Sequence, residues 1–349
     1  MLFHAQTSHI LNESSNFDVL KKSAEEIRNI LEEMTGIDGN DLNAEKDTKL
    51  NTGVAITPEN AVACITDFMR TVKFMRGVYN AVLDMQKKFP SEKIHLLYVG
   101  TGPFASLVIP LLHLFDPQKL KITYLDIYKR STDTLEEIIH ELNLKDFTNG
   151  IICCDAVTYK HPQPDKVHIV LSETMSSGLK KEMQVPITLN LVPQICNGGV
   201  LVPENIVVSV SADKINTTLN GNSCEISKNI FSKKIFELNI DSIINFVKYF
   251  NGEKDFTNKL LPAEKVVIPE NFNFPLKLKI DTEIKVCKNI IIGYNETSLT
   301  LPYNIKSNKN FSGGNVLKFY YKINEYPEFV FDYKRKQNLF NKLFTKIFS

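Results

Sequence analysis

The sequence contains no apolar run close to the roughly 20 residues that a membrane-spanning helix needs. Its start, MLFHAQTSHILNESSNFD, lacks both a basic segment and a long apolar stretch, so we expect no secretory signal peptide. The formal net charge is only +1 at pH 7, which gives no overall attraction to a polyanion or an anionic bilayer. These absences predict a protein that binds neither nucleic acid nor membrane.

Cysteine is scarce and scattered. The chain has 6 cysteines, of which only Cys153 and Cys154 are adjacent. This pattern fits reduced thiols in a cytosolic protein better than a disulfide framework or a zinc site. We therefore predict a cytoplasmic protein that holds no metal.

The chain is long enough, at 349 residues, for two domains with separate cores. Residues 15–35 carry apolar side chains at helical spacing, including Leu20, Ile27 and Leu31. Thr57-Pro58-Glu59 has the residues of a helix start, with a capping hydroxyl followed by proline. We expect the helix that begins there to continue to about Lys88.

Apolar strands alternate with helical segments in the middle of the chain. The strand-like runs are IHLLYVG, KITYLDI, GIICC and VHIVLSE, and STDTLEEIIHELNL has a helical pattern. This alternation is typical of a parallel sheet covered on both faces. Beyond Val200, period-2 stretches such as NIVVSVSA and PLKLKIDTEIKV indicate antiparallel strands, interrupted by a helix at IDSIINFVKYF. We predict three parts: an N-terminal helical segment 1–56, a Rossmann-like α/β domain 57–202, and a β-rich, barrel-like domain 203–349.

The segment YVGTGPFASL places Gly100, Thr101 and Gly102 in a turn between the first strand and a following helix. Glycines allow a ligand to approach the backbone, and a helix N-terminus offers free N–H groups. Asp126 ends the next strand, where its carboxylate can bind both hydroxyls of a ribose. Asp155 follows GIICC, where a loop can reach an adenine amino group. These five residues predict a nucleotide-type cofactor site.

Dinucleotides and S-adenosyl-L-methionine (SAM) both bind at sites of this layout. The dinucleotide fingerprint GxGxxG is not met, because position 105 is alanine. Arg70, in the helix before the sheet, can pair bidentately with the amino-acid carboxylate of SAM. The alternative is that Arg70 is an ordinary solvated charge. We predict SAM as the cofactor.

Two glutamates, Glu173 and Glu182, lie at the two ends of the loop SETMSSGLKKE after the last of these strands. Two like charges on one tight loop are costly unless a cation lies between them. Two carboxylates that grip a planar guanidinium would hold one nitrogen in line with the methyl group of SAM. They would also favour the transition state electrostatically. The alternative is that both are ordinary loop charges.

The motifs resemble those of the protein arginine methyltransferases, a branch of the class I SAM-dependent methyltransferases. Asp67, Arg70, Thr71 and Phe74 match the family's Asp-x-x-Arg-Thr-x-x-Tyr/Phe helix motif. Ser-Glu-x-Met with a second, loop-closing glutamate is matched by SETMSSGLKKE, and GGVLVPENI is similar to the entry into the family's β-barrel. The resemblance implies a methyltransferase sheet, catalytic Glu173 and Glu182, and dimers formed through an arm, for which IDSIINFVKYF is a candidate. It also places Met175 beside the acceptor, although methionine after a strand is more often core.

The sequence also departs from the family. The chain has no tryptophan and no histidine beyond His168, so the family's Thr-His-Trp loop is missing. Phe104 replaces the third glycine of the family's turn, Tyr98 replaces an acidic residue before it, and NTGVAITPEN stands where a tyrosine-rich helix covers SAM. We read these changes as a shift toward a small guanidino or amino acceptor, such as free arginine.

Two other functions stay open. GTGPF is similar to the turn of nicotianamine-synthase-like enzymes, which transfer the aminocarboxypropyl group of SAM instead of its methyl group. A non-catalytic subunit could also keep the fold and the SAM site while acting in an assembly.

Overall fold

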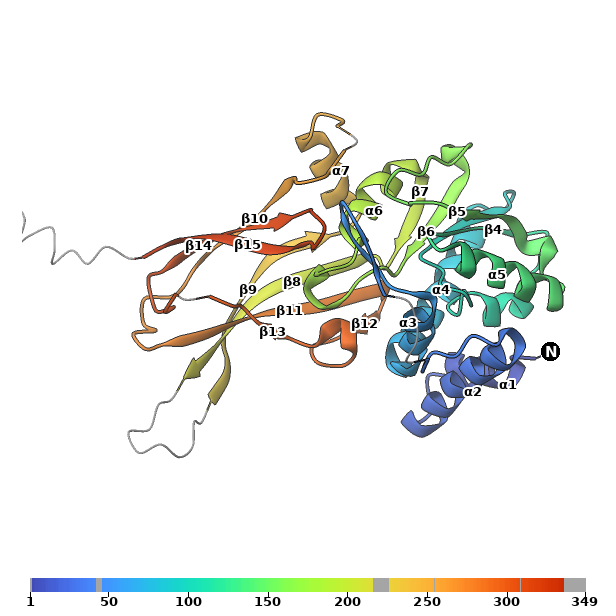
Figure 1. Cartoon of the computed structure of the whole chain (residues 1–349), viewed down its shortest axis with the longest axis horizontal. Coiled ribbons are helices and arrows are strands. Elements are labelled where there is room, and N and C mark those ends of the chain that lie inside the picture. Colours follow the sequence, from blue (N-terminus) through green and yellow to red (C-terminus); the bar gives the residue numbers. More distant parts are fainter. Residues whose placement is uncertain (1, 42–45, 216–225, 254, 308, 336–349) are drawn as a thin grey trace, which may run out of the picture.

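The computed structural model describes residues 2–41, 46–215, 226–253, 255–307 and 309–335 (Figure 1). Helices gather at the N-terminus, a parallel sheet follows, and antiparallel strands form the remainder of the fold. None of the helices among these residues is both long and apolar enough to cross a bilayer.

The N-terminal region contains two helices that pack on a third. The elements are α1 (His4–Leu11), α2 (Phe17–Thr35), β1 (Thr48–Leu50), β2 (Gly53–Ala55), α3 (Pro58–Ala63) and α4 (Phe68–Lys88). In α2 the side chain of Asn16 accepts from the amide of Val19, and Gly36 ends the helix in the left-handed region with φ of 72°. Its apolar stripe, which includes Ile27 and Leu31, is fully buried.

The helix predicted from Thr57 to Lys88 is broken into two helices. Thr57 does cap α3, by accepting from the amide of Asn60. A 3-10 turn (Cys64–Thr66) then follows, and Asp67 leaves the helical region with ψ of 70°. Thr71 donates its hydroxyl hydrogen to the carbonyl of Ile65 at 3.3 Å, which satisfies a carbonyl that the break would leave free. The break therefore separates α3 from α4.

The parallel sheet has five strands in the order β5-β4-β3-β6-β7, and every neighbouring pair is parallel. The strands are β3 (Ile94–Val99), β4 (Leu120–Asp126), β5 (Thr148–Cys153), β6 (Val167–Ser172) and β7 (Ile195–Val202). Helices α5 (Lys129–Glu141) and α6 (Gln184–Leu191) pack on it together with α4. The strand order reverses at β3, and in open sheets of this kind ligands bind beside the carboxyl ends of the strands at that point.

The helix predicted after the glycine turn is absent from the structure. Residues 101–108 form turns, and a 3-10 segment spans Ile109–Leu114. Ala105 has a positive φ of 43°, which no α-helix accommodates. Pro110 has no amide hydrogen to donate to the carbonyl of residue 106. No α-helix therefore begins directly after the turn.

The remainder of the described chain forms two antiparallel sheets. The first has the order β12-β11-β8-β9, with β13 paired to β11, and the second has the order β10-β14-β15. The strands are β8 (Asn205–Ile215), β9 (Ile226–Leu238), β10 (Leu260–Val267), β11 (Leu276–Cys287), β12 (Ile290–Ile292), β13 (Tyr303–Asn304), β14 (Val316–Lys322) and β15 (Glu328–Lys334), with helix α7 (Ile240–Tyr249) after β9. The change from parallel to antiparallel pairing falls between Val202 and Asn205.

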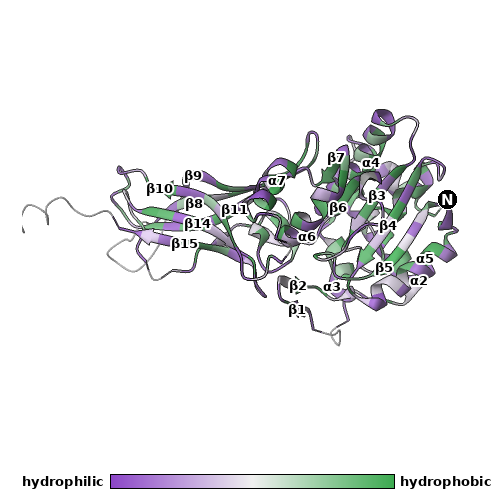
Figure 2. Ribbon diagram, turned by 90° about the horizontal axis from the view of Figure 1, so that it is seen from above, coloured by the Kyte–Doolittle hydropathy of each residue, from purple (hydrophilic) through white to green (hydrophobic). Residues whose placement is uncertain are grey.

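The parallel sheet and the antiparallel region are in direct contact. At Gly77 of α4, an added Cβ would overlap the side chain of Val286 in β11, so glycine permits this close approach. The hairpin formed by β1 and β2 lies between the two regions in both views (Figures 1 and 2). This hairpin occupies the stretch where the sequence predicted an altered cofactor cover.

Candidate active site

One pocket lies at the carboxyl ends of β3, β4 and β6, under residues 54–65. Met175 does not line it: its side chain is 2% exposed and packs in the hydrophobic core. Burial of an apolar side chain is favourable, so the loop turns this residue inward and away from the predicted acceptor position. The other predicted site residues all line this pocket, namely Arg70, Gly100, Thr101, Gly102, Asp126, Asp155, Glu173 and Glu182.

The glycine turn approaches two other walls of the pocket. Gly100 and Gly102 have φ values of 68° and 57°, in the left-handed region that favours glycine. An added Cβ at Gly100 would overlap the side chain of Thr174, and one at Gly102 would lie 3.0 Å from the Cβ of Ala61 in α3. The glycines therefore bring the turn against both the glutamate loop and α3.

Asp126 and Asp155 have backbone partners that fix their orientation. Asp126 accepts from the amide of Gly102 through Oδ2 and from the amide of Tyr128 through Oδ1, both at 2.9 Å. Burial raises the pKa of the Asp126 carboxyl, against these hydrogen bonds, which lower it. Asp155 accepts from the amide of Val157 at 2.9 Å. Each carboxylate keeps lone pairs that a ligand can use.

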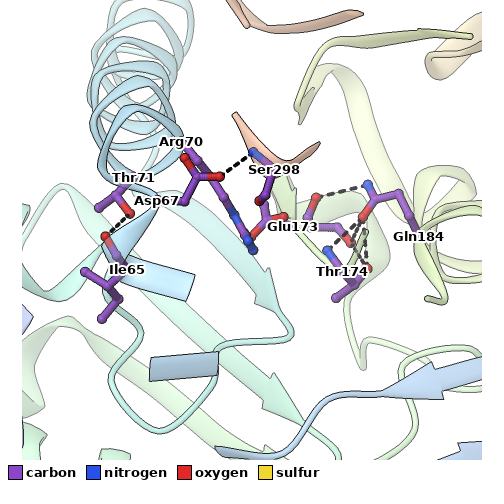
Figure 3. Close-up of polar contacts among 9 residues, drawn as sticks. Ile65, Asp67, Arg70, Thr71, Glu173, Thr174, Gln184 and Ser298 are labelled. Carbon is purple, nitrogen blue, oxygen red and sulfur yellow. Dashed lines mark hydrogen bonds and ion pairs between the residues drawn. The ribbon is translucent and has the colours of Figure 1, made fainter. Parts of the chain in front are cut away.

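Arg70 and Glu173 form an ion pair across the pocket (Figure 3). Arg70 Nε donates to Glu173 Oε2 at 3.0 Å, and a second bond joins Arg70 Nη2 to the same oxygen. The two side chains are 11% and 7% exposed. Burial raises the pKa of the Glu173 carboxyl, although the charge of Arg70 lowers it. The pairing holds Glu173 in one orientation and leaves its second oxygen, Oε1, buried and without a partner.

Glu182 lies close enough to Glu173 for the two charges to interact. Burial, followed by the negative charge of Glu173, raises the pKa of Glu182 to about 7.

The thiol of Cys64, which sequence reasoning missed, lines the same part of the pocket. Burial raises its pKa, and the charges of Arg70 and both glutamates act on it. The two predicted carboxylates therefore share one pocket with a guanidinium and a neutral thiol.

Gln184 fixes the base of the loop that carries both glutamates. Its Oε1 accepts from the amide of Thr174 at 3.0 Å and from the hydroxyl of Thr174 at 2.9 Å, and its Nε2 donates to the carbonyl of Ser172 at 3.0 Å (Figure 3). Gln184 is buried. No pattern in the sequence indicates this role, because glutamine at the start of a helix is common and its partners are set only by the fold.

The tip of the loop is held by the antiparallel region. The amide of Gly178 donates to the hydroxyl of Thr282 at 2.8 Å, and the hydroxyl of Tyr321 donates to the carbonyl of Leu179 at 2.7 Å. At the other side, Asp67 at the start of α4 accepts from the amide of Ser298 at 2.7 Å (Figure 3). Both halves of the molecule therefore shape the glutamate side of the pocket.

Two buried polar atoms of the pocket wall have no hydrogen-bond partner among the residues that the structure describes. They are Thr101 Oγ1 and Glu173 Oε1. Buried polar groups are nearly always paired, so atoms without partners on a pocket wall indicate a polar ligand. Ser131 also lines the pocket, and its hydrogen bond to Asp126 lowers the pKa of that carboxyl. Sequence reasoning missed it, since a serine in the first turn of a helix is ordinary.

The fold can be compared with known structures. The chain aligns with Arabidopsis thaliana protein arginine methyltransferase 10 at a TM-score of 0.51 and 12% identity, over 77% of this chain and 88% of that one. The chain has the fold of the protein arginine methyltransferases. It also matches the Trypanosoma brucei PRMT1 enzyme–prozyme heterotetrameric complex with AdoHcy at a TM-score of 0.47 and 13% identity, over 79% of this chain and 98% of that one. No protein-family model and no curated protein matches the sequence.

Proposed function

We propose that this protein is a SAM-dependent N-methyltransferase that acts on the guanidino group of a small acceptor such as free arginine. The observation that carries the proposal is the buried Glu173 Oε1, which faces a pocket shared with Glu182 and has no partner. A buried carboxylate oxygen that is held in place and has no partner can accept a hydrogen bond from a ligand. A guanidinium, which carries several N–H groups, is a suitable ligand. The shared fold supports the same reaction class.

The pocket residues fit SAM as the cofactor. Thr101 Oγ1 is an unpaired acceptor or donor on the cofactor side, and Asp126 keeps lone pairs for ribose hydroxyls. Arg70 offers Nη1 and the remainder of its guanidinium to an amino-acid carboxylate, beside its bond to Glu173. SAM, when bound, supplies a methyl group on a positively charged sulfur. AdoHcy, its demethylated product, is present in the Trypanosoma brucei complex.

The acceptor would lie between the two glutamates. Glu173 would accept from one guanidinium nitrogen through Oε1, and Glu182 would accept from another, which leaves the third nitrogen directed at the methyl donor. Transfer of the methyl group that SAM would supply would form an N–C bond on that nitrogen as the S–C bond breaks, and the nitrogen would then release one proton. Glu182, whose pKa is about 7, is suited to receive it.

The small size of the acceptor is supported by the cover of the pocket. The amide of Val54 in β2 donates to the carbonyl of Lys181 at 2.9 Å, so the hairpin packs on the acceptor loop itself. An added Cβ at Gly53 would meet Met183 at 2.6 Å, which shows how close this contact is. A long peptide would have to displace the hairpin, whereas a free amino acid would not.

The test is to incubate purified protein with SAM and a panel of guanidines and amines that includes free arginine and an arginine-containing peptide. We expect a gain of one or more methyl groups on a small guanidine and release of S-adenosylhomocysteine. Glu136→Gln, an exposed carboxylate on α5, is the matched control for Glu173→Gln. Release of methylthioadenosine would instead show aminocarboxypropyl transfer. SAM binding with no product from any acceptor would indicate a non-catalytic subunit.

Two further properties belong to this proposal. The described cysteines are free thiols, which supports a cytoplasmic protein. Helix α7 leaves Ile244 and Tyr249 37% and 61% exposed, so it is the candidate arm of a homodimer. Light scattering on the purified chain and on Ile244→Asp tests the dimer, which the variant should weaken.

A further inference from the structure

Lys181, the residue before Glu182, is held from three sides. Its amide donates to the carbonyl of Pro327 at 2.8 Å, between β14 and β15. Its carbonyl accepts from the amide of Val54 in β2. Its Nζ lies 2.7 Å from Oδ2 of Asp47. The backbone of Lys181 has a φ of 74°, a conformation that a lysine rarely adopts without such restraint. These contacts fix the direction in which Glu182 leaves the loop.

Asp47 connects this loop to the cover of the pocket. Through Oδ1 it accepts from the amide of Thr57 at 3.2 Å and from Nδ2 of Asn60 at 2.9 Å, both at the start of α3. Its other oxygen pairs with Lys181. The Asp47 and Lys181 side chains are 22% and 33% exposed, so the pair adds little to stability. Its effect is to fix geometry.

Residues 46–63 form a lid over the cofactor side of the pocket. Val54, Ala55, Ile56 and Ala61 contribute to its wall. The hydroxyl of Tyr128 donates to the carbonyl of Ala55 and accepts from the amide of Thr48, both at 3.0 Å. At the far end, Glu59 of the lid forms an ion pair with Arg130 of α5. A movement of these residues away from the pocket would break the contacts that Asp47 and Val54 make with Lys181.

We propose that Asp47 and Lys181 are positioning residues, which place Glu182 for the acceptor only when the lid (residues 46–63) is closed. The cofactor side and the acceptor side of the pocket are therefore completed together. The inference rests on the proposed function for the role of Glu182, but the closure itself can be measured without turnover.

The charges around Glu182 make the coupling visible in a pH profile. Glu173 and Asp47 raise the pKa of Glu182, whereas Arg70 and Lys181 lower it, in addition to the effect of burial. Asp47→Asn leaves Lys181 as an unpaired positive charge, so the acidic limb of activity should move to lower pH. Lys181→Met removes that positive charge, so the limb should move to higher pH. A purely structural defect would not shift the two variants in opposite directions.

The experiment compares wild type, Asp47→Asn, Lys181→Met and Lys181→Arg. The control is Asp84→Asn, which breaks an ion pair of the same 2.7 Å length between α4 and Lys288, away from the pocket. The asparagine at 47 can still accept from Thr57 and Asn60, so α3 keeps its start. We expect kcat to fall between about tenfold and about a hundredfold in Asp47→Asn and Lys181→Met. Lys181→Arg should recover most of it, and the control should match wild type.

Hydrogen exchange measures the closure independently of turnover. Peptides that contain the amides of Val54 and Lys181 should exchange faster in Asp47→Asn, with no change in β3 or β4. In wild type, SAM should slow exchange in both peptides. The inference would be overturned if exchange in these two peptides stayed unchanged. It would also be overturned if the acidic limbs of the activity profiles of Asp47→Asn and Lys181→Met moved in the same direction. If wild type methylates no acceptor, the proposed function fails. The hydrogen-exchange measurement alone then decides whether the lid and the glutamate loop are coupled.

Discussion

Arg70 Nε donates to Oε2 of Glu173 at 3.0 Å, so one oxygen of this carboxylate is used by the protein and the other is left for a ligand. The helix motif and the glutamate loop, which lie 103 residues apart in the sequence, therefore meet in a single pair. Arg70 has a double role in this arrangement: it orients Glu173 and offers its remaining N–H groups to the cofactor.

Arg70→Ala should weaken SAM binding by tenfold or more, because the amino-acid carboxylate loses its charged partner, which is worth about 1.5–3 kcal/mol. Calorimetric titration with SAM measures this. Lys87→Ala, an exposed charge in the last turn of the same helix, is the control and should bind SAM as wild type does. Equal affinity in Arg70→Ala and the control would remove Arg70 from the cofactor site.

Glu173→Gln and Glu182→Gln should each lose most turnover. Removal of one partner of a buried, charge-assisted pair typically costs about 2–5 kcal/mol, which corresponds to at least about a 30-fold decrease in kcat/KM for the acceptor. Steady-state kinetics with the acceptor identified in the panel measures the effect. SAM affinity should change less in Glu182→Gln than in Glu173→Gln, because Arg70 is hydrogen-bonded to Glu173 and interacts with Glu182 only through its charge. Turnover that survives in either variant would contradict the two-carboxylate site.

Glu182 should also reduce the stability of the protein at neutral and alkaline pH. Its pKa is raised from 4.5 to about 7, so the folded state binds a proton that the unfolded state has released between these values. Stability is therefore lost as the pH rises from about 4.5 to about 7 and stays lower above it. Glu182→Gln removes this loss and should unfold at a higher denaturant concentration than wild type at pH 8, by on the order of 2 kcal/mol, but not at pH 4.5. An equal difference at both pH values would assign the effect to packing instead.

The sequence predicted the parallel sheet well because each strand is a short apolar run bounded by turn residues. It also predicted which residues gather at the carboxyl ends of the strands, since Gly100, Asp126 and Glu173 each directly follow or end a strand. The residues without such a marker were missed: Gln184 and Cys64 acquire their roles only from neighbours distant in sequence. The pairing of Asp47 with Lys181, 134 residues apart, was missed for the same reason.

The two incorrect helix predictions have local causes that a periodicity pattern does not contain. The break at residues 64–67 depends on a hydroxyl of Thr71 that satisfies a carbonyl six residues earlier. The missing helix after the glycine turn depends on the positive φ of Ala105, a residue with a high helix propensity. In both cases, a local backbone conformation overrides the intrinsic preference of the segment.

A histidine cluster at the other end of the sheet should make the protein sensitive to acid. His95 is buried, with its Nε2 2.8 Å from Oγ1 of Thr123 and its ring centroid 4.7 Å from that of His161. Burial, followed by the charges of His161 and His168, lowers its pKa from 6.5 to about 4. In this window the unfolded chain binds a proton that the folded chain does not, so stability is lost as the pH falls from about 6.5 toward 4.

His95→Gln keeps a hydrogen-bonding side chain but does not titrate, so it should unfold with a shallower dependence on pH. Between pH 7.5 and pH 5 the wild type should lose about 2 kcal/mol more stability than the variant. Urea unfolding at the two pH values measures the difference, and His140→Gln, an exposed histidine on α5, is the control. If both variants lost stability as steeply as wild type, the acid sensitivity would have to come from the carboxylates, whose protonation also destabilises paired charges such as Asp47 with Lys181.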